Sequence, residues 1–376
     1  MSYVDIIEIG SACCYGFDVL DHTQTVRIDA RATYPIVVTP RAGLPPQRAT
    51  LADVARLAGV SAKTVSRVMS DDAKVSAQTR ERVLVSAKRL RFRPNQLARG
   101  LRRGGVSNTV AFVIGDLHNP FYMSTAAGVE RELAERGLTM ILATTDDSPG
   151  SEAVVVDALL AQRVRALLIV PIAEDQSYLE GERQLGTAVV SVDRPANNLV
   201  SDSVVLQNRE GTAAAVKSLL AIGHRRIGFV CSPRQLYTHQ ERLLGYRHAL
   251  LEAGITDSAR WERLEEVDGP STEESIRDLL AMDEPPTAII TGNNRASAGA
   301  VRELLTRRRD IAFIGFDDFE LADALGISVI AYDAMELGRQ AARLALARLD
   351  DPTGPPRAIS IPTWLVPRGS GEIPPS

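Results

Sequence analysis

The chain has 376 residues, 45% of them hydrophobic and 24% charged, and its formal net charge at pH 7 is −4. At about 150 residues per domain, this length predicts two or three domains. No apolar run approaches the ~20 residues that a membrane-spanning helix needs, so the composition excludes a membrane protein and indicates a globular one.

The N-terminus and the cysteines indicate the cellular setting. The first twenty residues contain no lysine or arginine, so they lack the basic segment of a secretory signal, and we expect the protein to stay in the cytoplasm. Cys13 and Cys14 are adjacent and Cys231 is distant, a spacing that suits neither a disulfide framework nor a zinc site. We therefore expect reduced thiols, no metal and no cofactor.

Charge is distributed unevenly along the chain. Residues 48–104 contain 14 lysines and arginines against four aspartates and glutamates, whereas residues 105–376 contain 26 against 38. A basic segment joined to an acidic body is typical of a nucleic-acid-binding module attached to a domain with another role, although charge alone fits a basic, solvated surface equally well.

Residues 1–47 show no sustained hydrophobic period, and they end in a stretch rich in proline and glycine, with Pro35, Pro40, Gly43, Pro45 and Pro46. We expect a disordered N-terminal extension outside the folded unit, and the pattern assigns it no role.

Three helices are predicted next, at 51–58, 62–69 and 76–90, and Pro94 ends the segment. Thr50 and Ser61 are placed as N-caps, and Gly59 ends the first helix. The apolar faces that would form a small core comprise Leu51, Val54, Ala55, Ala58, Val65, Val68, Val83, Ala87 and Leu90.

The first two of these helices, joined across a short turn, form a helix-turn-helix pattern, whose second helix enters the major groove of DNA. An ordinary helical hairpin is the alternative at this point. Side chains on the solvent face of the second helix would read bases, and they are Ala62, Lys63, Ser66 and Arg67. Residues near helix starts suit phosphate oxygens, and they are Thr50, Thr64, Ser76, Thr79 and Arg80.

After residue 108, short apolar runs alternate with helical stretches. The runs are 110–114, 138–143, 166–170, 188–192, 227–231, 288–291 and 311–316, and the helical stretches include 126–136, 211–221, 240–252, 273–282 and 337–349. This alternation predicts parallel sheets with helices on both faces. About 265 residues are more than a single hydrophobic core usually accommodates, so we expect two such doubly wound α/β subdomains in tandem.

The order and spacing of several short sequences resemble the lac repressor (LacI/GalR) family of bacterial regulators. They are ATLADVARLAGVSAKTVSRVM (49–69), VSAQTRERV (75–83), FRPNQLARGLR (92–102), NPFY (119–122), VDRP (192–195), GHRRIGFV (223–230) and GFDD (315–318). The resemblance implies an all-α helix-turn-helix headpiece (48–94), a hinge helix (95–104) and a periplasmic-binding-protein-like core of two subdomains (105–371), followed by a tail (372–376).

In the family, the hinge helix inserts a leucine into the minor groove, and Leu101 stands at the matching position, with Asn95 opening the segment. The eight residues 95–102 are far fewer than the ~12 to 15 at which isolated helices become marginal, and Gly100 costs about 1 kcal/mol more. We therefore expect this segment to be coil without DNA and helical on DNA.

Ligand-binding groups are expected on loops at the carboxyl ends of the strands, in the crevice between the sheets. By this rule the candidates are Asp116, Asn119, Phe121, Tyr122, Asp193, Arg194 and Asp317. The resemblance adds Arg242 and Asn293 and supports Asp317. The chain departs from the family at Asn293–Asn294, usually Asn-Asp, and at Tyr332–Asp333, usually Gln-Pro, so the ligand stays open.

The leading hypothesis is a homodimer or tetramer that binds double-stranded operator DNA, most often as a repressor in this family, under the control of a sugar-like effector. The alternatives are a small-molecule-binding protein for transport and a carbohydrate-acting enzyme. The basic headpiece argues against transport. No nucleophile or acid/base group accompanies His224, which favours a structural histidine over a catalytic one and a protein that is not an enzyme.

Overall fold

The computed structural model describes residues 49–70, 72, 74–93, 107–231, 236–264, 271–307 and 310–375, with the exception of the side chains of 305–307. The chain divides into two compact units, residues 1–95 and 96–376, which are described separately below. The predicted N-terminal extension and the predicted hinge, including Asn95 and Leu101, lie outside the described residues and stay predictions.

The N-terminal unit contains the three predicted helices, α1 (Leu51–Ala58), α2 (Ala62–Val68) and α3 (Ala77–Arg89). Thr50 caps α1 reciprocally, since its hydroxyl accepts from the Asp53 backbone N–H and the Asp53 carboxylate accepts from the Thr50 backbone N–H. Gly59 ends α1 with φ of 62°, a conformation in which a side chain would be strained. Ser61 caps α2 in turn, because its hydroxyl accepts from the Thr64 backbone N–H. The two predicted caps and the predicted end of α1 are therefore confirmed.

A small apolar core joins these helices. Its buried members are Val54, Ala55, Ala58, Val65, Val68, Val83 and Ala87, and Leu51 and Leu90 pack against it while partly exposed. Arg82 on α3 donates to the Ala58 carbonyl and so satisfies an acceptor at the end of α1. The unit thus has its own core and its own polar contacts.

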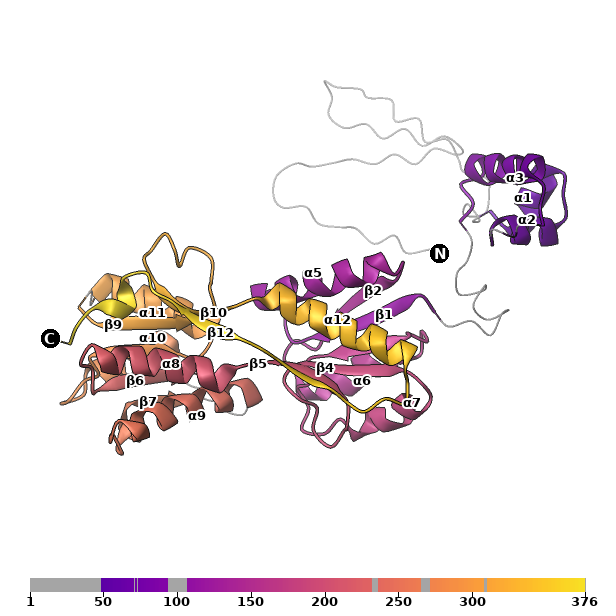
Figure 1. The fold of residues 1–376 in the computed structure, drawn as a ribbon. Helices are drawn as coiled ribbons and strands as arrows, with labels where there is room; N and C mark the ends of the chain where they lie inside the picture. Colours follow the sequence, from indigo (N-terminus) through magenta and orange to yellow (C-terminus); the bar gives the residue numbers. More distant parts are fainter. Residues whose placement is uncertain are drawn as a thin grey trace, which may run out of the picture. The chain divides into compact units, whose positions relative to one another are not determined.

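The second unit contains two six-stranded sheets (Figure 1). The first has the order β11-β5-β4-β3-β1-β2, with all neighbours parallel. The second has the order β12-β10-β9-β8-β6-β7, parallel except for the antiparallel pair β10–β12. The strands are β1 (Thr109–Ile114), β2 (Thr139–Thr144), β3 (Ala166–Ile169), β4 (Ala188–Asp193), β5 (Asp202–Leu206), β6 (Ile227–Cys231), β7 (Glu262–Leu264), β8 (Ala288–Thr291), β9 (Ala312–Phe316), β10 (Ser328–Tyr332), β11 (Ala358–Ile361) and β12 (Thr363–Val366).

Helices cover both faces of each sheet, which confirms the doubly wound prediction. In the first subdomain, α5 (Pro120–Glu135) and α12 (Ala334–Asp350) pack on one face and α6 (Pro149–Leu160) on the other. In the second, α8 (Asn208–Ala221) and α9 (Tyr237–Glu252) oppose α10 (Thr272–Leu280) and α11 (Asn294–Arg307). Shorter helices are α7 (Glu180–Gln184), η1 (Ser177–Leu179), η2 (Ser258–Trp261) and η3 (Ser370–Glu372).

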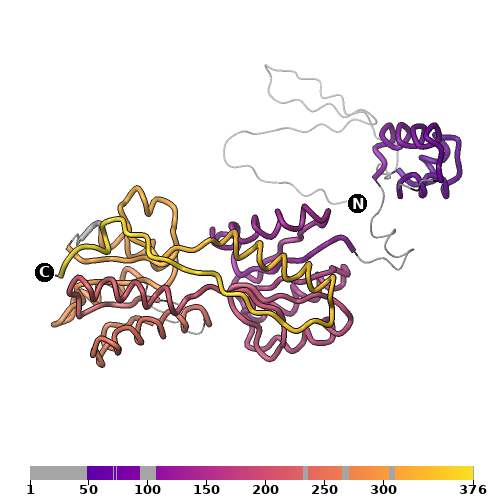
Figure 2. Tube along the Cα trace, in the orientation of Figure 1, coloured from indigo at the N-terminus to yellow at the C-terminus, as the bar shows by residue number. Residues whose placement is uncertain are grey.

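We had expected two subdomains that follow one another along the chain. The structure shows instead that each subdomain is built from separate segments. The chain passes between them after β5, after β10 and after β11, so that α12 and β11 return to the first subdomain (Figure 2). Three connections therefore lie between the two sheets, and the residues beside them are well placed to line a cleft.

The helices α5 and α12 approach each other unusually closely. A Cβ atom added to Gly128 on α5 would lie 2.0 Å from the Met335 carbonyl oxygen, and one added to Gly338 on α12 would lie 2.0 Å from the Thr125 carbonyl oxygen. Only glycine permits backbones to come this near, so the contact fixes α12 on α5.

The end of the chain is attached to the second subdomain. Residues 372 and 373, which we had assigned to a tail, form contacts there: the Ser328 hydroxyl donates to the Glu372 carboxylate, and the Ile373 carbonyl lies 2.8 Å from Nε2 of His224. His224 is fully buried, with Nδ1 2.8 Å from the Thr287 hydroxyl, which confirms its predicted structural role.

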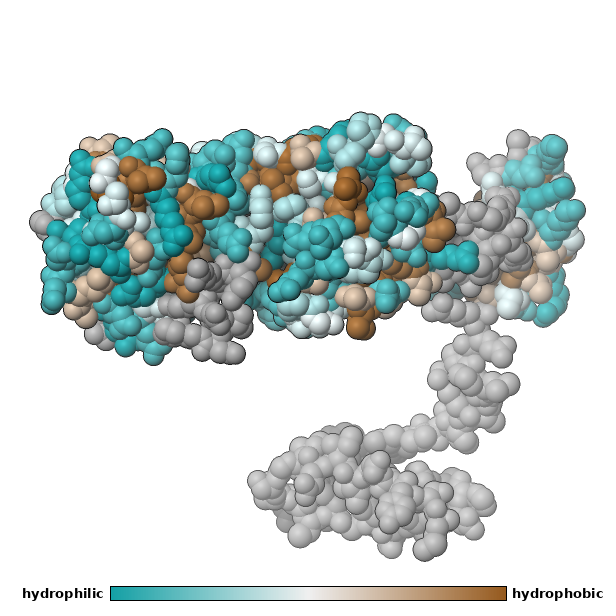
Figure 3. All heavy atoms as spheres, turned by 90° about the horizontal axis from the view of Figure 1, so that it is seen from below, coloured by the Kyte–Doolittle hydropathy of each residue, from teal (hydrophilic) through white to brown (hydrophobic). Residues whose placement is uncertain are grey.

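Hydrophilic side chains predominate on the face drawn in Figure 3, with hydrophobic residues in scattered patches between them. Within the described ranges, no helix has both the length and the apolar composition that crossing a membrane requires.

Candidate functional site

The second helix of the headpiece has one buried and one exposed face. Val65 and Val68 are buried, whereas the four residues predicted to read bases, Ala62, Lys63, Ser66 and Arg67, are all exposed. Arg67 lies 3.7 Å from the Asp72 carboxylate, and both side chains are partly open to solvent, so this pair is weak and leaves Arg67 able to turn toward another partner. The exposed face therefore has the polar groups that a major groove would meet.

The residues predicted to contact phosphates have capping and loop contacts of their own. The Ser76 hydroxyl donates to Thr79 over 3.0 Å, Thr64 lies 2.9 Å from the Ser61 hydroxyl, and Thr50 donates to Asp53 over 2.7 Å. Arg80 donates to the Asp72 carbonyl. These contacts order the helix starts, whose backbone N–H groups suit an anion.

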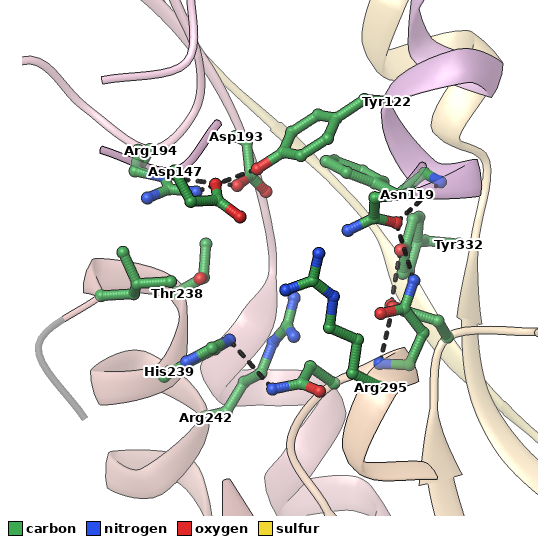
Figure 4. Close-up of a pocket in the computed structure, with 15 residues that line it drawn as sticks. Asn119, Tyr122, Asp147, Asp193, Arg194, Thr238, His239, Arg242, Arg295 and Tyr332 are labelled. Atoms are coloured by element: carbon green, nitrogen blue, oxygen red, sulfur yellow. Dashed lines mark hydrogen bonds and ion pairs between the residues drawn. The ribbon is translucent and has the colours of Figure 1, made fainter. Parts of the chain in front are cut away.

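In the second unit, a pocket lies between the two subdomains, with about 580 Å³ of empty space that includes its open mouth (Figure 4). Eight of the nine predicted ligand residues line it: Asn119, Phe121, Tyr122, Asp193, Arg194, Arg242, Asn293 and Asp317. The ninth, Asp116, does not line the pocket. It forms an ion pair with Arg295, which does line the pocket. The structure thus brings together residues that are up to 198 positions apart, from Asn119 to Asp317.

Two aspartates enter the pocket from equivalent positions in the two sheets. Asp193 ends β4 and Asp317 follows β9, the third strand from the edge in each sheet order. Their φ values are 71° and 72°, a left-handed conformation that costs a non-glycine residue about 1 to 2 kcal/mol. Backbone strain of this kind is concentrated at functional sites.

Arg194 lies on the first-subdomain side of the pocket beside Tyr122, Asp147 and Asp193. Its Nη2 donates to the Tyr122 hydroxyl over 3.1 Å, and its Nε lies 3.5 Å from the Asp193 carboxylate in an ion pair, while Nη1 is buried and forms no hydrogen bond within the described residues. Burial raises the pKa of Asp193 and of Asp147, although Arg194 acts in the opposite direction on both. Buried donors without partners are costly, so the Arg194 guanidinium is suited to an additional acceptor.

Arg242 holds the other side of the pocket. Its Nε donates to Asn208 Oδ1 over 2.7 Å, its Nη1 donates to the Gly292 carbonyl over 2.6 Å, and its guanidinium lies 3.6 Å from the centre of the Phe316 ring. These contacts fix the orientation of a buried cation, and a ligand would meet a preset donor rather than a mobile one.

Asp317 is held by its own subdomain. The Tyr332 hydroxyl donates to one carboxylate oxygen over 2.5 Å, and the Asn294 backbone N–H donates to the other over 3.1 Å. Burial and the Asp317 charge raise the pKa of Tyr332 well above its usual value, so Tyr332 remains a donor. The Phe121 ring meets the Tyr332 ring edge-on at 5.7 Å between centres, which gives this end of the pocket an apolar surface.

The sequence reasoning missed seven lining residues: Asp147, Leu236, Thr238, His239, Asn294, Arg295 and Tyr332. Asn294 and Tyr332 had been noted as departures from the family pattern but not as ligand residues. Thr238 and His239 lie in the first turn of α9, one turn before Arg242, a spacing that places them on one helix face and could have identified them. Among the described residues, no cluster of His, Cys, Asp or Glu could hold a metal ion.

Comparison with known proteins supports the same division of the chain. Residues 50–95 match the family model "Bacterial regulatory proteins, lacI family", and residues 216–371 match a periplasmic binding protein-like domain. The regulator GalR of Escherichia coli K12 is 31% identical over 313 residues, which are 81% of this chain and 90% of GalR. The chain belongs to the lacI family. The ribose operon repressor of the same strain is also 31% identical, over 86% of this chain and 99% of that protein.

Solved structures of lacI-family regulators share the fold. The lac repressor dimer bound to operator and an anti-inducer has a TM-score of 0.75 and 25% identity, covering 86% of this chain and 99% of that one. A regulator from Silicibacter pomeroyi has a TM-score of 0.73 and 26% identity, covering 85% and 98%. The predicted headpiece and two-subdomain core are therefore confirmed, and the chain is a DNA-binding transcriptional regulator of this family.

Proposed function

We propose that this lacI-family regulator is a repressor, that it binds operator DNA as a homodimer, and that a sugar or sugar derivative in the pocket controls its affinity for DNA. The observation that carries the proposal is the pocket itself. Both subdomains line it, and the Nη1 group of its buried Arg194 has no hydrogen bond within the described residues, in a chain that also carries a helix-turn-helix unit. A regulator of transcription acts on the chromosome, so we place it in the cytoplasm.

Each predicted residue receives a role in this proposal. Lys63 and Arg67 would pair with guanine edges, while Ala62 and Ser66 contact neighbouring bases. Thr50, Thr64, Ser76, Thr79 and Arg80 would approach phosphates, and Asn95 and Leu101 would act in the minor groove.

In the pocket, arginine donors and carboxylate acceptors suit hydroxyl groups, which both donate and accept hydrogen bonds. Arg194 and Asp193 would bind one edge of the effector and Arg242 and Asp317 the opposite edge, while the Phe121 ring covers an apolar face. Relatives support this class of ligand, since a structure of CelR with cellobiose has 29% identity and a TM-score of 0.63.

A regulator that binds DNA and a ligand needs no catalytic group, and we infer that this protein is not an enzyme. The pocket contains charged and aromatic side chains that bind, but the described lining places no serine or cysteine nucleophile beside His239. A transport protein, the alternative, would share the pocket but would have no use for the headpiece.

Selection from a random duplex pool followed by ligand titration tests the proposal. The full-length protein should enrich a pseudo-palindromic sequence, because two headpieces related by a two-fold axis read two half-sites. Fluorescence anisotropy with that duplex, in the presence of a panel of mono- and disaccharides at fixed salt, should then identify a sugar that changes the apparent Kd by about 5- to 150-fold. A pool without a common sequence contradicts the DNA-binding role. A sugar that binds without changing operator affinity favours the transport alternative.

A further inference from the structure

Two hydrogen-bonded pairs join the subdomains at the edge of the pocket. The Asn294 side-chain amide donates to Asn119 Oδ1 over 2.7 Å, and Arg295 forms an ion pair with Asp116. Asp116 and Asn119 belong to the first subdomain, whereas Asn294 and Arg295 belong to the second. An opening of the cleft that separates these residues must break both contacts.

Both pairs lie where a helix begins. Asn119 is the N-cap of α5, and Asn294 and Arg295 are the first two residues of α11. Two helix N-termini are thus brought together from different subdomains, and each carries a partial positive charge of about half an elementary charge. The acceptors Asn119 Oδ1 and Asp116 lie between them, which makes the approach of the two helices favourable.

The two members of the ion pair differ in their exposure to solvent. The Asp116 side chain is 13% exposed, and one of its oxygens accepts from the His118 backbone N–H over 2.8 Å. That hydrogen bond holds the pKa of Asp116 below its usual value, so the carboxylate is charged at neutral pH. The Arg295 side chain is 68% exposed, and among the described residues the Asp116 carboxylate is the group with which it forms an ion pair. The carboxylate is therefore held by a second contact within its own subdomain, whereas the guanidinium is mostly exposed.

We propose that Asp116, Asn119, Asn294 and Arg295 form a clasp that holds the cleft closed before a ligand binds. Arg295 also lines the pocket, so a bound ligand would touch the clasp. The clasp rests on the proposed ligand pocket, but its effect is measurable in the protein without ligand. Loss of the clasp raises the fraction of molecules with an open cleft, and it removes no contact within either subdomain.

Distance measurements between spin labels test the clasp in the full-length chain. Val154→Cys on α6 and Leu251→Cys on α9 place one nitroxide on each subdomain, at side chains that are 70% and 61% exposed. Cys13 and Cys14 are replaced by serine, and Cys231 stays because it is buried. Labelled protein is diluted with unlabelled protein so that the measured pairs lie within one chain.

In this background, Arg295→Met should raise the ratio of long to short distances by about two- to fivefold, the range that an exposed ion pair supplies. Arg302→Met is the matched control, because Arg302 lies on the same helix and pairs with Glu273 within the second subdomain. Sodium chloride at 1 M, where the Debye length is about 3 Å, should shift the parent protein toward the Arg295→Met distribution.

A distance distribution of Arg295→Met identical to that of the parent protein would overturn the clasp, and so would an equal shift in Arg302→Met. Either result would leave the operator and sugar titrations untouched, so the clasp and the proposed function fail separately.

Discussion

The close contact between α5 and α12 makes a sharp prediction for Gly128→Ala. The added Cβ would lie 2.0 Å from the Met335 carbonyl oxygen and 3.1 Å from the Arg339 backbone nitrogen, whereas ordinary contact begins at 3.4 Å. The helices would have to separate by about 1.4 Å, the difference between 3.4 Å and 2.0 Å. Val129 and Ala341, which are fully buried in the same core, would lose contacts as α12 moves.

Overpacking of this kind costs about 1 to 3 kcal/mol or more, and the better helix propensity of alanine returns about 1 kcal/mol. We expect a net destabilisation of up to about 2 kcal/mol, measured by urea unfolding followed by circular dichroism. The matched control is Gly150→Ala in the first turn of α6, where an added Cβ meets no atom within 4 Å. That variant should gain about 0.4 to 1 kcal/mol. If Gly128→Ala is as stable as Gly150→Ala, the argument from the close approach is wrong.

Three further predictions concern function and pH. Arg67→Ala should lower the affinity for the selected operator by about 1 to 3 kcal/mol while leaving the affinity for a scrambled duplex nearly unchanged, as measured by anisotropy at fixed salt; equal losses on both duplexes would contradict base reading. Arg242→Met should remove the response of DNA binding to the sugar and keep operator binding, which titration with and without the sugar checks. Burial lowers the pKa of His224 below its unfolded value of about 6.5, so protonation favours the unfolded chain. Stability should therefore be complete above pH 6.5 and decrease below it, and His224→Gln should flatten that decrease in urea unfolding between pH 5 and 7.5.

In the second unit, the sequence predicted four helices well in their middle and poorly at their start. The stretches expected at 211–221, 240–252 and 337–349 begin three residues earlier in the structure, as α8, α9 and α12, and the stretch expected at 126–136 begins six residues earlier, as α5. Apolar periodicity marks the buried face, whereas the first turn of each helix here contains polar residues. The N-cap Asn119 and the first-turn residues Asn208 and His239 lie in or beside the pocket. The signal that locates a helix is therefore weakest where the site is built.

The strands that were missed lack the signal on which the prediction depended. β5 alternates buried and half-buried residues, and β11 and β12 are sheet edges with exposed positions such as Trp364, so neither forms a continuous apolar run. β10 is apolar, but it follows a loop that gave no helix to separate it from β9. The return of the chain to the first subdomain through α12 depends on contacts between distant residues, which no local pattern records.

Apart from the residues supplied by the resemblance to the family, the sequence identified the site residues that lie at or just after the ends of predicted strands. Asp193 and Asp317 follow apolar strands directly, and the resemblance to the family supplied Arg242 and Asn293. Arg295 had no such signal, because a charged residue at the start of a helix most often faces solvent. Its importance here comes from Asp116, 179 residues away, whose carboxylate is brought to it by the other subdomain.

The same geometry shows how a ligand could act beyond the pocket. Tyr332 lies in the pocket, and Asp333 directly after it is the N-cap of α12, with its carboxylate accepting from the Glu336 backbone N–H over 2.8 Å. Asn119 begins α5 at the same pocket, and the glycine contact prevents α5 and α12 from sliding independently. A ligand that contacts both helix starts would therefore move the two helices as one body. It can change DNA affinity only by the difference in its binding to the closed and open forms, and that difference includes the free energy of the clasp that closure forms.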